Sequence, residues 1–308
     1  MEIKRCGIIT IVGRPNVGKS TLLNALVGEK IAIVTSKPQT TRNRICGIVN
    51  RDGCQYVFTD TPGLHRAHNR LGECMDGMVR ASINDVDAAV LVVEPIPSLG
   101  EPELQLIQRI KALKVPGVLV INKTDTVQQL RKLDNPPITG TEVMEVIAAY
   151  EKEHTFDAII PLSAKKGQGV AELMELLGQY LTEGHQLFPE DMTTDQPERQ
   201  MMAEILREKM LRLLQKEIPH GTAVEISKFA ERDNEIIDVE ATIYCEKASH
   251  KGIIIGKQGA MMKRISSSAR RDMERFMGTK VFLTTWVKVK ENWRDNQTAI
   301  QNFGYSDR

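Results

Sequence analysis

The sequence predicts an α/β domain with a six-stranded, mostly parallel sheet flanked by helices, followed by a smaller α+β domain. The chain has 308 residues, and a typical domain of ~150 residues makes two domains the first expectation. Apolar runs alternate with helical stretches over the first ~180 residues, which is typical of a parallel sheet crossed by helices. After a polar stretch with two prolines at 184–197, the order of elements changes.

The expected elements follow from apolar periodicity and from turn residues. In the first domain the strands are expected at 7–12, 45–50, 54–60, 88–94, 117–122 and 158–162, and the helices at 18–27, 73–84, 102–113, 141–153 and 170–181. In the second, helices are expected at 198–216, 247–255, 260–277 and 292–300, and strands at 222–229, 236–245 and 281–290. We therefore expect domains at 1–182 and 197–308, joined by a linker at 183–196.

The composition predicts a globular protein with real cores, since 41% of the residues are apolar and 26% are charged. The longest unbroken apolar stretch, 88–93, is far shorter than the ~20 residues that span a bilayer. Residues 1–7 show no signal-peptide pattern, and the five cysteines form no C-x-x-C pair. We expect a cytoplasmic protein without a disulfide framework or a zinc site.

Charge is distributed unevenly along a chain whose net charge is only +1. Residues 247–290 hold 11 basic and two acidic side chains, a net charge of 11 − 2 = +9. Such a block favours a polyanionic partner for this part of the chain, with a solvated surface as the alternative.

A glycine-rich motif, GRPNVGKS at 13–20, lies between an expected strand and an expected helix. This is the context in which G-x-x-x-x-G-K-[ST] binds phosphates, because glycines let backbone N–H groups converge on them. Lys19 would reach the β- and γ-phosphate oxygens, and the Ser20 hydroxyl would bind Mg²⁺.

Asp60 ends the third expected strand and opens the motif DTPG at 60–63, 40 residues after Ser20. A carboxylate there can hold Mg²⁺, and the Gly63 N–H can meet a γ-phosphate. The loop PQTTR at 38–42 offers a second threonine ligand for Mg²⁺. Thr41 is our choice and Thr40 the alternative.

Two further motifs, NKTD at 122–125 and SAK at 163–165, end the fifth and sixth expected strands. Asp125 can accept hydrogen bonds from N1–H and the exocyclic amine of guanine, a pair that adenine lacks. Lys123 would lie over the base, and the Ala164 N–H would donate to guanine O6. The residues predicted to contact the nucleotide are Gly13, Arg14, Pro15, Asn16, Val17, Gly18, Lys19, Ser20, Thr21, Asp60, Thr61, Pro62, Gly63, Asn122, Lys123, Asp125, Ser163, Ala164 and Lys165.

The second domain contains IIIGKQG at 253–259 between two expected helices. A G-x-x-G loop allows a nucleic-acid backbone to approach closely, and KH modules use it to clamp about four nucleotides. The preceding pair of strands and the following helix, with one basic and one apolar face, predict a type II KH domain. The predicted RNA-binding residues are Ile255, Gly256, Lys257, Gln258, Gly259, Lys263, Arg264, Arg270, Arg271 and Arg275; the apolar face holds Met262, Ile265, Ala269, Met273 and Phe276.

These motifs resemble the five G-motifs of the translation-factor-related GTPases, and with IIIGKQG the whole chain is similar to the Era family. The resemblance implies a P-loop GTPase domain and a KH domain that use GTP or GDP with Mg²⁺. It implies a bacterial protein that binds 16S ribosomal RNA near its 3′ end and assists 30S subunit maturation and rRNA processing. Peripheral membrane association, known for the family, would have only the basic block to act through. We expect a monomer.

Leu64 stands directly after DTPG, where Ras-like enzymes place a water-orienting glutamine. Leucine cannot hydrogen-bond to water, so we expect slow intrinsic turnover, with Lys19, Asn16 and Gly63 as catalytic residues. In related GTPases an asparagine at the position of Asn16 helps to hold K⁺, which makes K⁺ a candidate cofactor. Arg14 lies nearby but is not assigned as an arginine finger.

Two rival functions fit parts of the sequence. The first is a constitutive RNA-binding assembly factor whose nucleotide domain is mainly structural. The second, a tRNA-modification GTPase, would need a modifying domain that these residues do not supply. Trp286, Trp293, Phe303 and Tyr305 could stack on bases, although packing inside the domain is the favoured interpretation.

Overall fold

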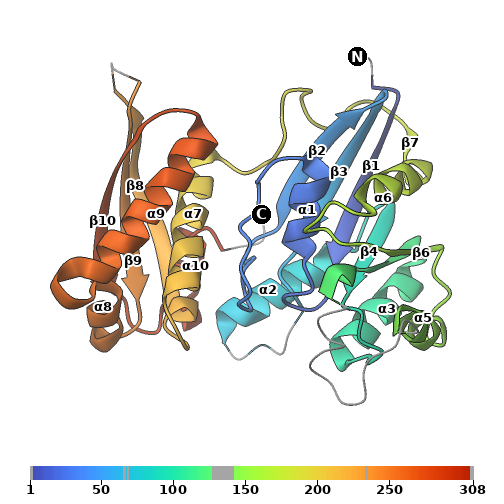
Figure 1. Ribbon diagram of the computed structural model, residues 1–308, viewed down its shortest axis with the longest axis horizontal. Helices are drawn as coiled ribbons and strands as arrows, with labels where there is room; N and C mark the ends of the chain where they lie inside the picture. The colour runs from blue at the N-terminus through green and yellow to red at the C-terminus, as the bar shows by residue number, and fades with distance from the viewer. Residues whose placement is uncertain (1–2, 65–66, 68, 127–141, 233–234, 306–308) are drawn as a thin grey trace. The chain divides into compact units, whose positions relative to one another are not determined.

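The computed structural model describes residues 3–64, 67, 69–126, 142–232 and 235–305 (Figure 1). The chain forms two compact units. The first unit comprises Met1–Ala32, Thr41–Arg66 and Met75–Asp195, and the second comprises Ile33–Thr40, Ala67–Cys74 and Gln196–Arg308. Two short segments from the first half of the chain therefore pack with the second unit.

The first unit contains the predicted sheet, and all six expected strands are present. They are β1 (Arg5–Val12), β2 (Ile45–Arg51), β3 (Cys54–Asp60), β4 (Ala88–Val93), β5 (Gly117–Ile121) and β6 (Ala158–Pro161), in the order β2-β3-β1-β4-β5-β6. Only β2 runs antiparallel to its neighbour on this path. A seventh strand, β7 (Thr182–Glu183), pairs antiparallel with β1 and was not predicted. The carboxyl ends of the parallel strands meet at one edge, where the predicted motifs lie.

Helices cover both faces of this sheet (Figure 1). They are α1 (Lys19–Val27), α2 (Arg70–Ala81), α3 (Glu101–Leu113), α5 (Glu142–Glu151) and α6 (Val170–Leu177), with short 3₁₀ turns η1 (Thr124–Thr126) and η2 (Gly178–Tyr180). One apolar cluster joins α1 and α6 to the sheet, and another joins α3 and α5 to its other face. Thr141, the expected first residue of the fourth helix, lies outside the described residues.

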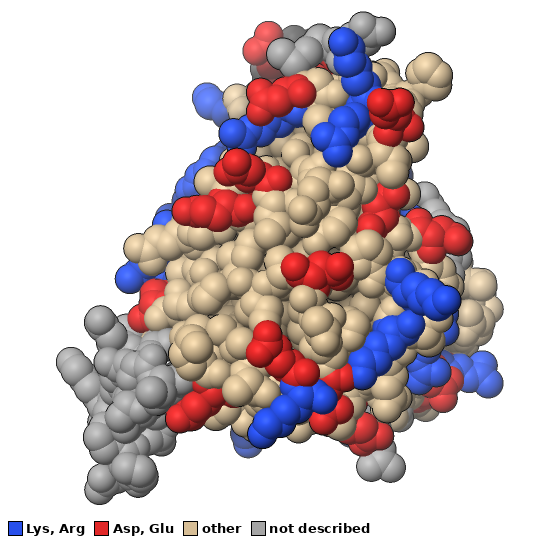
Figure 2. All heavy atoms as spheres, turned by 90° about the vertical axis from the view of Figure 1, so that its right-hand side faces the viewer, with Lys and Arg blue, Asp and Glu red and all other residues tan. Residues whose placement is uncertain are grey.

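The charges of the first unit form no large block of one sign on the described surface seen in Figure 2, where acidic and basic side chains are interspersed. This agrees with the small net charge of residues 1–196, where 21 basic and 24 acidic residues give 21 − 24 = −3. None of the helices in the described part of the chain has the length and apolar character needed to cross a membrane.

The second unit contains a three-stranded sheet in the order β10-β9-β8. Its elements are α7 (Glu198–Leu213), η3 (Pro219–Gly221), β8 (Thr222–Glu231), β9 (Ile237–Cys245), α8 (Ala248–Ile255), η4 (Lys257–Gly259), α9 (Ala260–Met277), β10 (Val281–Val289), η5 (Trp293–Asp295) and α10 (Gln297–Asn302). β9 pairs antiparallel with β8 and parallel with β10. Alternate residues of β9, including Val239, Ala241 and Ile243, are fully buried in the cluster with α7 and α9.

The end of the chain differs from the expected single helix over 292–300. The chain instead forms η5, and α10 begins only after Asn296. The Asn296 side chain explains this start, because its Oδ1 accepts a hydrogen bond from the Ala299 N–H at 2.9 Å and caps the helix.

The aromatic residues of this region mostly pack inside the domain, as favoured from the sequence. Trp293, Phe303 and Tyr305 are buried, and the Trp293 ring centroid lies 5.2 Å from that of Phe303. Trp286 differs, since 45% of its surface is exposed.

Candidate functional site

The phosphate loop connects β1 to α1, and its glycines are required by sterics. Gly13 has a φ of 151°, and a Cβ there would lie 2.4 Å from the Val92 carbonyl oxygen. Gly18 has a φ of 102°, and a Cβ there would lie 2.3 Å from Asn122 Nδ2. Both distances are impossible for a real side chain, so the loop can close against β4 and the NKTD motif only with glycine.

Lys19 points back into this loop from the first turn of α1. Its Nζ donates hydrogen bonds to the carbonyl oxygens of Gly13 at 3.0 Å and Arg14 at 2.9 Å. Burial lowers the pKa of Lys19 to about 8, although the nearby Asp60 carboxylate acts in the opposite direction. A buried cation of this kind gains from an anionic partner, which phosphate oxygens would supply.

Three oxygens predicted to bind Mg²⁺ meet at one point. Ser20 Oγ donates to Asp60 Oδ2 at 2.6 Å and lies 2.8 Å from Thr41 Oγ1, which is 3.2 Å from the same carboxylate oxygen. Burial raises the pKa of Asp60, and Lys19 opposes this effect. Two hydroxyls and a buried carboxylate are hard oxygen ligands of the type that Mg²⁺ prefers.

The alternative threonine, Thr40, lies outside this group. Its Oγ1 is 2.8 Å from Thr35 Oγ1 and donates to the Lys37 carbonyl oxygen at 2.7 Å. The geometry therefore favours Thr41 as the second hydroxyl ligand.

The DTPG backbone lies directly against the phosphate loop. A Cβ on Gly63 would be 2.5 Å from the Pro15 nitrogen, so only glycine permits this approach. Thr61 Oγ1 donates to the Ile11 carbonyl oxygen at 3.2 Å, and the adjacent Pro62 is buried. Leu64 is packed in the apolar cluster with α3 and α5, where it has no means of orienting a water molecule.

Asn122 holds three loops together at the guanine end of the site. Its Nδ2 donates to the Val17 carbonyl oxygen at 2.8 Å, and its Oδ1 accepts from the Ala164 N–H at 3.0 Å. The Ala164 N–H, which is predicted to donate to guanine O6, thus lies beside Asn122 at this end of the site. Ser163 Oγ donates to Asp125 Oδ1 at 2.7 Å and orients the carboxylate predicted to read the base.

Lys123 connects the NKTD motif to the phosphate loop and to Glu94. Its Nζ donates to the Asn16 carbonyl oxygen at 2.5 Å and to Glu94 Oε1 at 2.6 Å. Sequence reasoning missed Glu94, although its place directly after β4 puts it at the same sheet edge.

Arg14 forms an ion pair with Glu103 of α3, a second residue that sequence reasoning missed. Glu103 is only 1% exposed, and no sequence motif marks it. Among the other predicted nucleotide residues, Thr21 lies in α1 and Lys165 is exposed after β6.

The GKQG segment forms an exposed tight turn between α8 and α9. Gly256, Gln258 and Gly259 have φ values of 75°, 51° and 77°. A Cβ on Gly256 would lie 2.7 Å from Met261 Cβ, whereas one on Gly259 would meet no described atom within 4 Å. Gly256 therefore closes the turn, and Gly259 leaves open space through which a nucleic-acid backbone can approach.

Helix α9 has the predicted basic face. The exposed basic residues on it are Lys263, Arg264, Arg270, Arg271 and Arg275. Ile265, Ala269 and Met273 are fully buried on the opposite face, whereas Phe276, expected beside them, is 37% exposed. Phe276 lies in the last turn of the helix, where Met277 packs against the core instead.

Comparisons with known proteins match both parts of the chain. The family model described as a 50S ribosome-binding GTPase matches residues 8–123, and the KH domain model matches residues 217–294. GTPase Era of Clostridioides difficile (strain 630) is 47% identical over 305 residues, with 99% of each chain covered.

Two solved structures of Era have the same fold as the whole chain. One is Era in complex with MgGDPNP and nucleotides 1506–1542 of 16S ribosomal RNA, with a TM-score of 0.91, 35% identity, and coverage of 99% of this chain and 100% of that one. The other is a single-residue variant of Aquifex aeolicus Era bound to GDP·AlF₄⁻, with a TM-score of 0.91, 35% identity, and coverage of 98% and 100%.

Fold, site and comparisons define this protein as a P-loop GTPase that also carries a KH domain. The identity extends over nearly all of the chain and of its relatives. The chain belongs to the Era family of GTPases.

Proposed function

We propose that this GTPase is a switch that binds 16S ribosomal RNA near its 3′ end through its KH domain. It thereby assists 30S subunit maturation and rRNA processing, acting as a monomer. The observation that carries the proposal is that one chain combines an assembled guanine-nucleotide site with an exposed basic KH loop. The RNA-bound Era structure of the same fold supports the choice of RNA. We assign the two activities to residues 1–182 and 197–308. Residues 183–195, expected as part of a linker, pack with the first unit, where Asp195 accepts from the Cys46 N–H.

In the nucleotide site, the oxygens of Ser20, Thr41 and Asp60 would hold Mg²⁺, and their convergence fits such an ion. A Mg²⁺ ion held by these residues would supply positive charge to the phosphate oxygens. Lys19 would supply a second positive charge to the phosphate oxygens, and the Gly63 N–H would meet the γ-phosphate. Asp125 reads guanine, held in place by Ser163.

The catalytic group of this site is not a side-chain base at position 64, because Leu64 is buried in the core. Arg14 is engaged by Glu103 and is not assigned as a finger. The residues assigned to catalysis are Lys19, Asn16 and Gly63, which position and stabilise the phosphates. A GTPase with such a site is expected to have a slow intrinsic rate of GTP hydrolysis.

We expect K⁺ to accelerate hydrolysis relative to Na⁺. Asn16 is exposed at the tip of the phosphate loop, where its side chain can help to hold a monovalent cation beside the phosphates. The measurement is the single-turnover rate at equal ionic strength in KCl and NaCl, for the wild type and Asn16→Ala. Equal wild-type rates, or a K⁺ effect that survives in Asn16→Ala, would remove the K⁺ role.

In the RNA site, Gly256–Gly259 clamps the RNA backbone and the basic face of α9 binds phosphates. The basic residues that peripheral membrane association would need are assigned to RNA instead. The rival, a constitutive RNA-binding factor, predicts an RNA affinity that ignores the bound nucleotide. Comparing the affinity of the GDP-bound and GTP-analogue-bound protein for 3′-terminal 16S RNA decides between the two.

A further inference from the structure

Helix α7 buries three consecutive charged residues. Arg207 and Glu208 are fully buried, and Lys209 is only 4% exposed. Successive helical residues point ~100° apart, so these side chains leave the helix in three directions. Burying a charge is costly unless it is paired. The partners of these three side chains therefore indicate which segments α7 stabilises.

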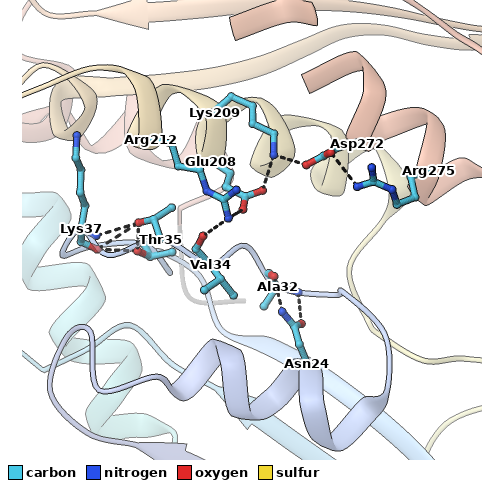
Figure 3. Close-up of polar contacts among 11 residues, drawn as sticks. Asn24, Ala32, Val34, Thr35, Lys37, Glu208, Lys209, Arg212, Asp272 and Arg275 are labelled. Carbon is cyan, nitrogen blue, oxygen red and sulfur yellow. Dashed lines mark hydrogen bonds and ion pairs between the residues drawn. The ribbon is translucent and has the colours of Figure 1, made fainter. Parts of the chain in front are cut away.

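One set of partners lies on residues 33–40, here called the strap, which pack in the second unit together with α7. Arg207 pairs with Glu204 of its own helix, and it also donates hydrogen bonds to the carbonyl oxygens of Gln39, at 3.3 Å, and Thr40. One turn further along, Arg212 Nη2 donates to the Val34 carbonyl oxygen at 2.8 Å (Figure 3). The two arginines thus hold the backbone at both ends of the strap.

The strap is also tied to the end of α7 and closed on itself. Lys37 Nζ donates to the Leu214 carbonyl oxygen, and the Lys37 N–H donates to Thr35 Oγ1 at 3.1 Å. Because Thr35 Oγ1 is also 2.8 Å from Thr40 Oγ1, the strap is a braced segment rather than an open loop. These contacts join residues near the two ends of the strap directly.

The chain on either side of the strap is fixed within the first unit. Asn24 Oδ1 accepts from the Ala32 N–H at 2.9 Å, directly before the strap (Figure 3). Directly after it, Thr41 Oγ1 meets Ser20 and Asp60 at the proposed Mg²⁺ site. A single peptide bond separates the Thr40 carbonyl, held by Arg207, from the residue assigned to the metal.

The other partners of α7 lead to the RNA-binding helix α9 (Figure 3). Arg212 pairs with Glu208, whose Oε2 is 3.3 Å from Lys209 Nζ. Lys209 also pairs with Asp272 of α9, and Asp272 Oδ1 accepts from Arg275 Nη1 at 3.0 Å. The charges alternate along the whole series from Arg212 to Arg275.

We propose that this series, called here the α7 relay (Arg212, Glu208, Lys209, Asp272 and Arg275), couples the strap to the RNA-binding face of α9. Arg207 and Arg212 are positioning residues, because their contacts depend on the position of the strap. The relay then sets how strongly Asp272 engages Arg275, and hence how available Arg275 is to an RNA phosphate. The inference rests on the proposed function, whose regulation it assigns to named residues.

The physical basis is that a buried charge must keep a partner. If the nucleotide state shifts Thr41 and the strap, Arg212 changes its hydrogen bond to Val34 and, with it, how closely its guanidinium pairs with the buried Glu208 carboxylate. Lys209 is shared between Glu208 and Asp272, so a change at the first carboxylate alters its hold on the second. Such coupling is reciprocal: RNA must change nucleotide affinity by the same factor by which nucleotide changes RNA affinity.

The test measures the full chain's affinity for a single-stranded RNA of the 3′-terminal 16S sequence, bound either to GDP or to a non-hydrolysable GTP analogue. The coupling ratio is the quotient of the two dissociation constants. The variants Glu208→Gln and Arg212→Gln each remove one charge from the relay. Lys209→Arg keeps the positive charge at position 209. Asp238→Asn is the matched control, because Asp238 also pairs with two cations of the second unit, Lys228 and Arg232, outside the relay.

Allosteric coupling usually changes affinity by about 5-fold or more, so we expect a wild-type coupling ratio of at least that size. We expect Glu208→Gln and Arg212→Gln to bring this ratio close to one. Lys209→Arg and Asp238→Asn should keep the wild-type ratio. In the two relay variants, adding RNA should also no longer change the affinity for the GTP analogue. A general loss of stability would not selectively abolish this effect of RNA. Arg212 is half exposed, so its variant keeps the test valid if Glu208→Gln does not fold.

A wild-type ratio retained by both relay variants overturns the relay and leaves the proposed function standing. A wild-type ratio of one contradicts the proposed switch itself, and the relay with it. The two failures are therefore distinguishable in one set of measurements.

Discussion

Asp125→Asn is expected to change the nucleotide preference from guanine to xanthine. The carboxylate accepts from N1–H and the exocyclic amine of guanine, whereas an amide presents a donor where xanthine offers a carbonyl. Two hydrogen bonds to a charged group at ~1.5–3 kcal/mol each make the loss of GTP affinity about 10²- to 10⁴-fold. Ser163 continues to hold residue 125 in place, so the site should stay assembled.

The measurement is the dissociation constant for GTP and xanthosine triphosphate, in the wild type and the variant. Asp52→Asn is the matched control, because it makes the same chemical change on a residue exposed in the turn between β2 and β3. Asn also tolerates the positive φ of 52° at that position. Tight GTP binding by Asp125→Asn without any gain for xanthosine triphosphate would show that Asp125 does not read the base.

Changing Lys257 and Gln258 together to aspartate is expected to abolish useful RNA binding. Both side chains are exposed at the tip of the GKQG turn, so two carboxylates would stand where the RNA backbone must pass. The loss should reach about 10²-fold or more, because it removes a phosphate contact and adds repulsion. Aspartate accepts the positive φ of Gln258, so the turn should survive.

The control for charge alone is Arg271→Ala with Arg275→Ala on α9. This pair should weaken all RNAs alike and lower the salt slope by about one to two units, at ~0.7 per single-strand phosphate contact. GTP affinity, measured in parallel, should be unchanged in both proteins. If the double aspartate variant binds single-stranded ribosomal RNA as tightly as the wild type, the KH loop does not carry RNA binding.

The sheet and the nucleotide loops could be predicted from the sequence because their signals are local. Buried parallel strands appear as apolar runs such as 88–93, and each motif follows a strand at the edge where ligands bind. Gly13 and Gly63 are also part of these local motifs. Each glycine packs against another segment of the site, where a Cβ would clash. The choice between Thr40 and Thr41 required the structure, because both threonines stand in the same loop.

The residues that sequence reasoning missed depend on tertiary contacts. Glu94 and Glu103 bear no motif, and only the folded chain brings them to Lys123 and Arg14. Periodicity gives α7 an apolar face but does not reveal that its charged residues are also buried. Arg207 also contacts the strap and Lys209 pairs with α9, both far from α7 in the sequence, whereas Glu208 pairs within α7. Long-range polar pairs of this kind leave no local pattern for a sequence argument to use.

Nucleotide state and RNA binding are expected to be linked in this chain. The decisive measurement is the affinity of the wild-type protein for 3′-terminal 16S RNA at one salt concentration, with GDP or with a non-hydrolysable GTP analogue and Mg²⁺. We expect the two dissociation constants to differ by about 5-fold or more. Equal dissociation constants would instead show a constitutive RNA-binding factor whose RNA affinity does not depend on the nucleotide.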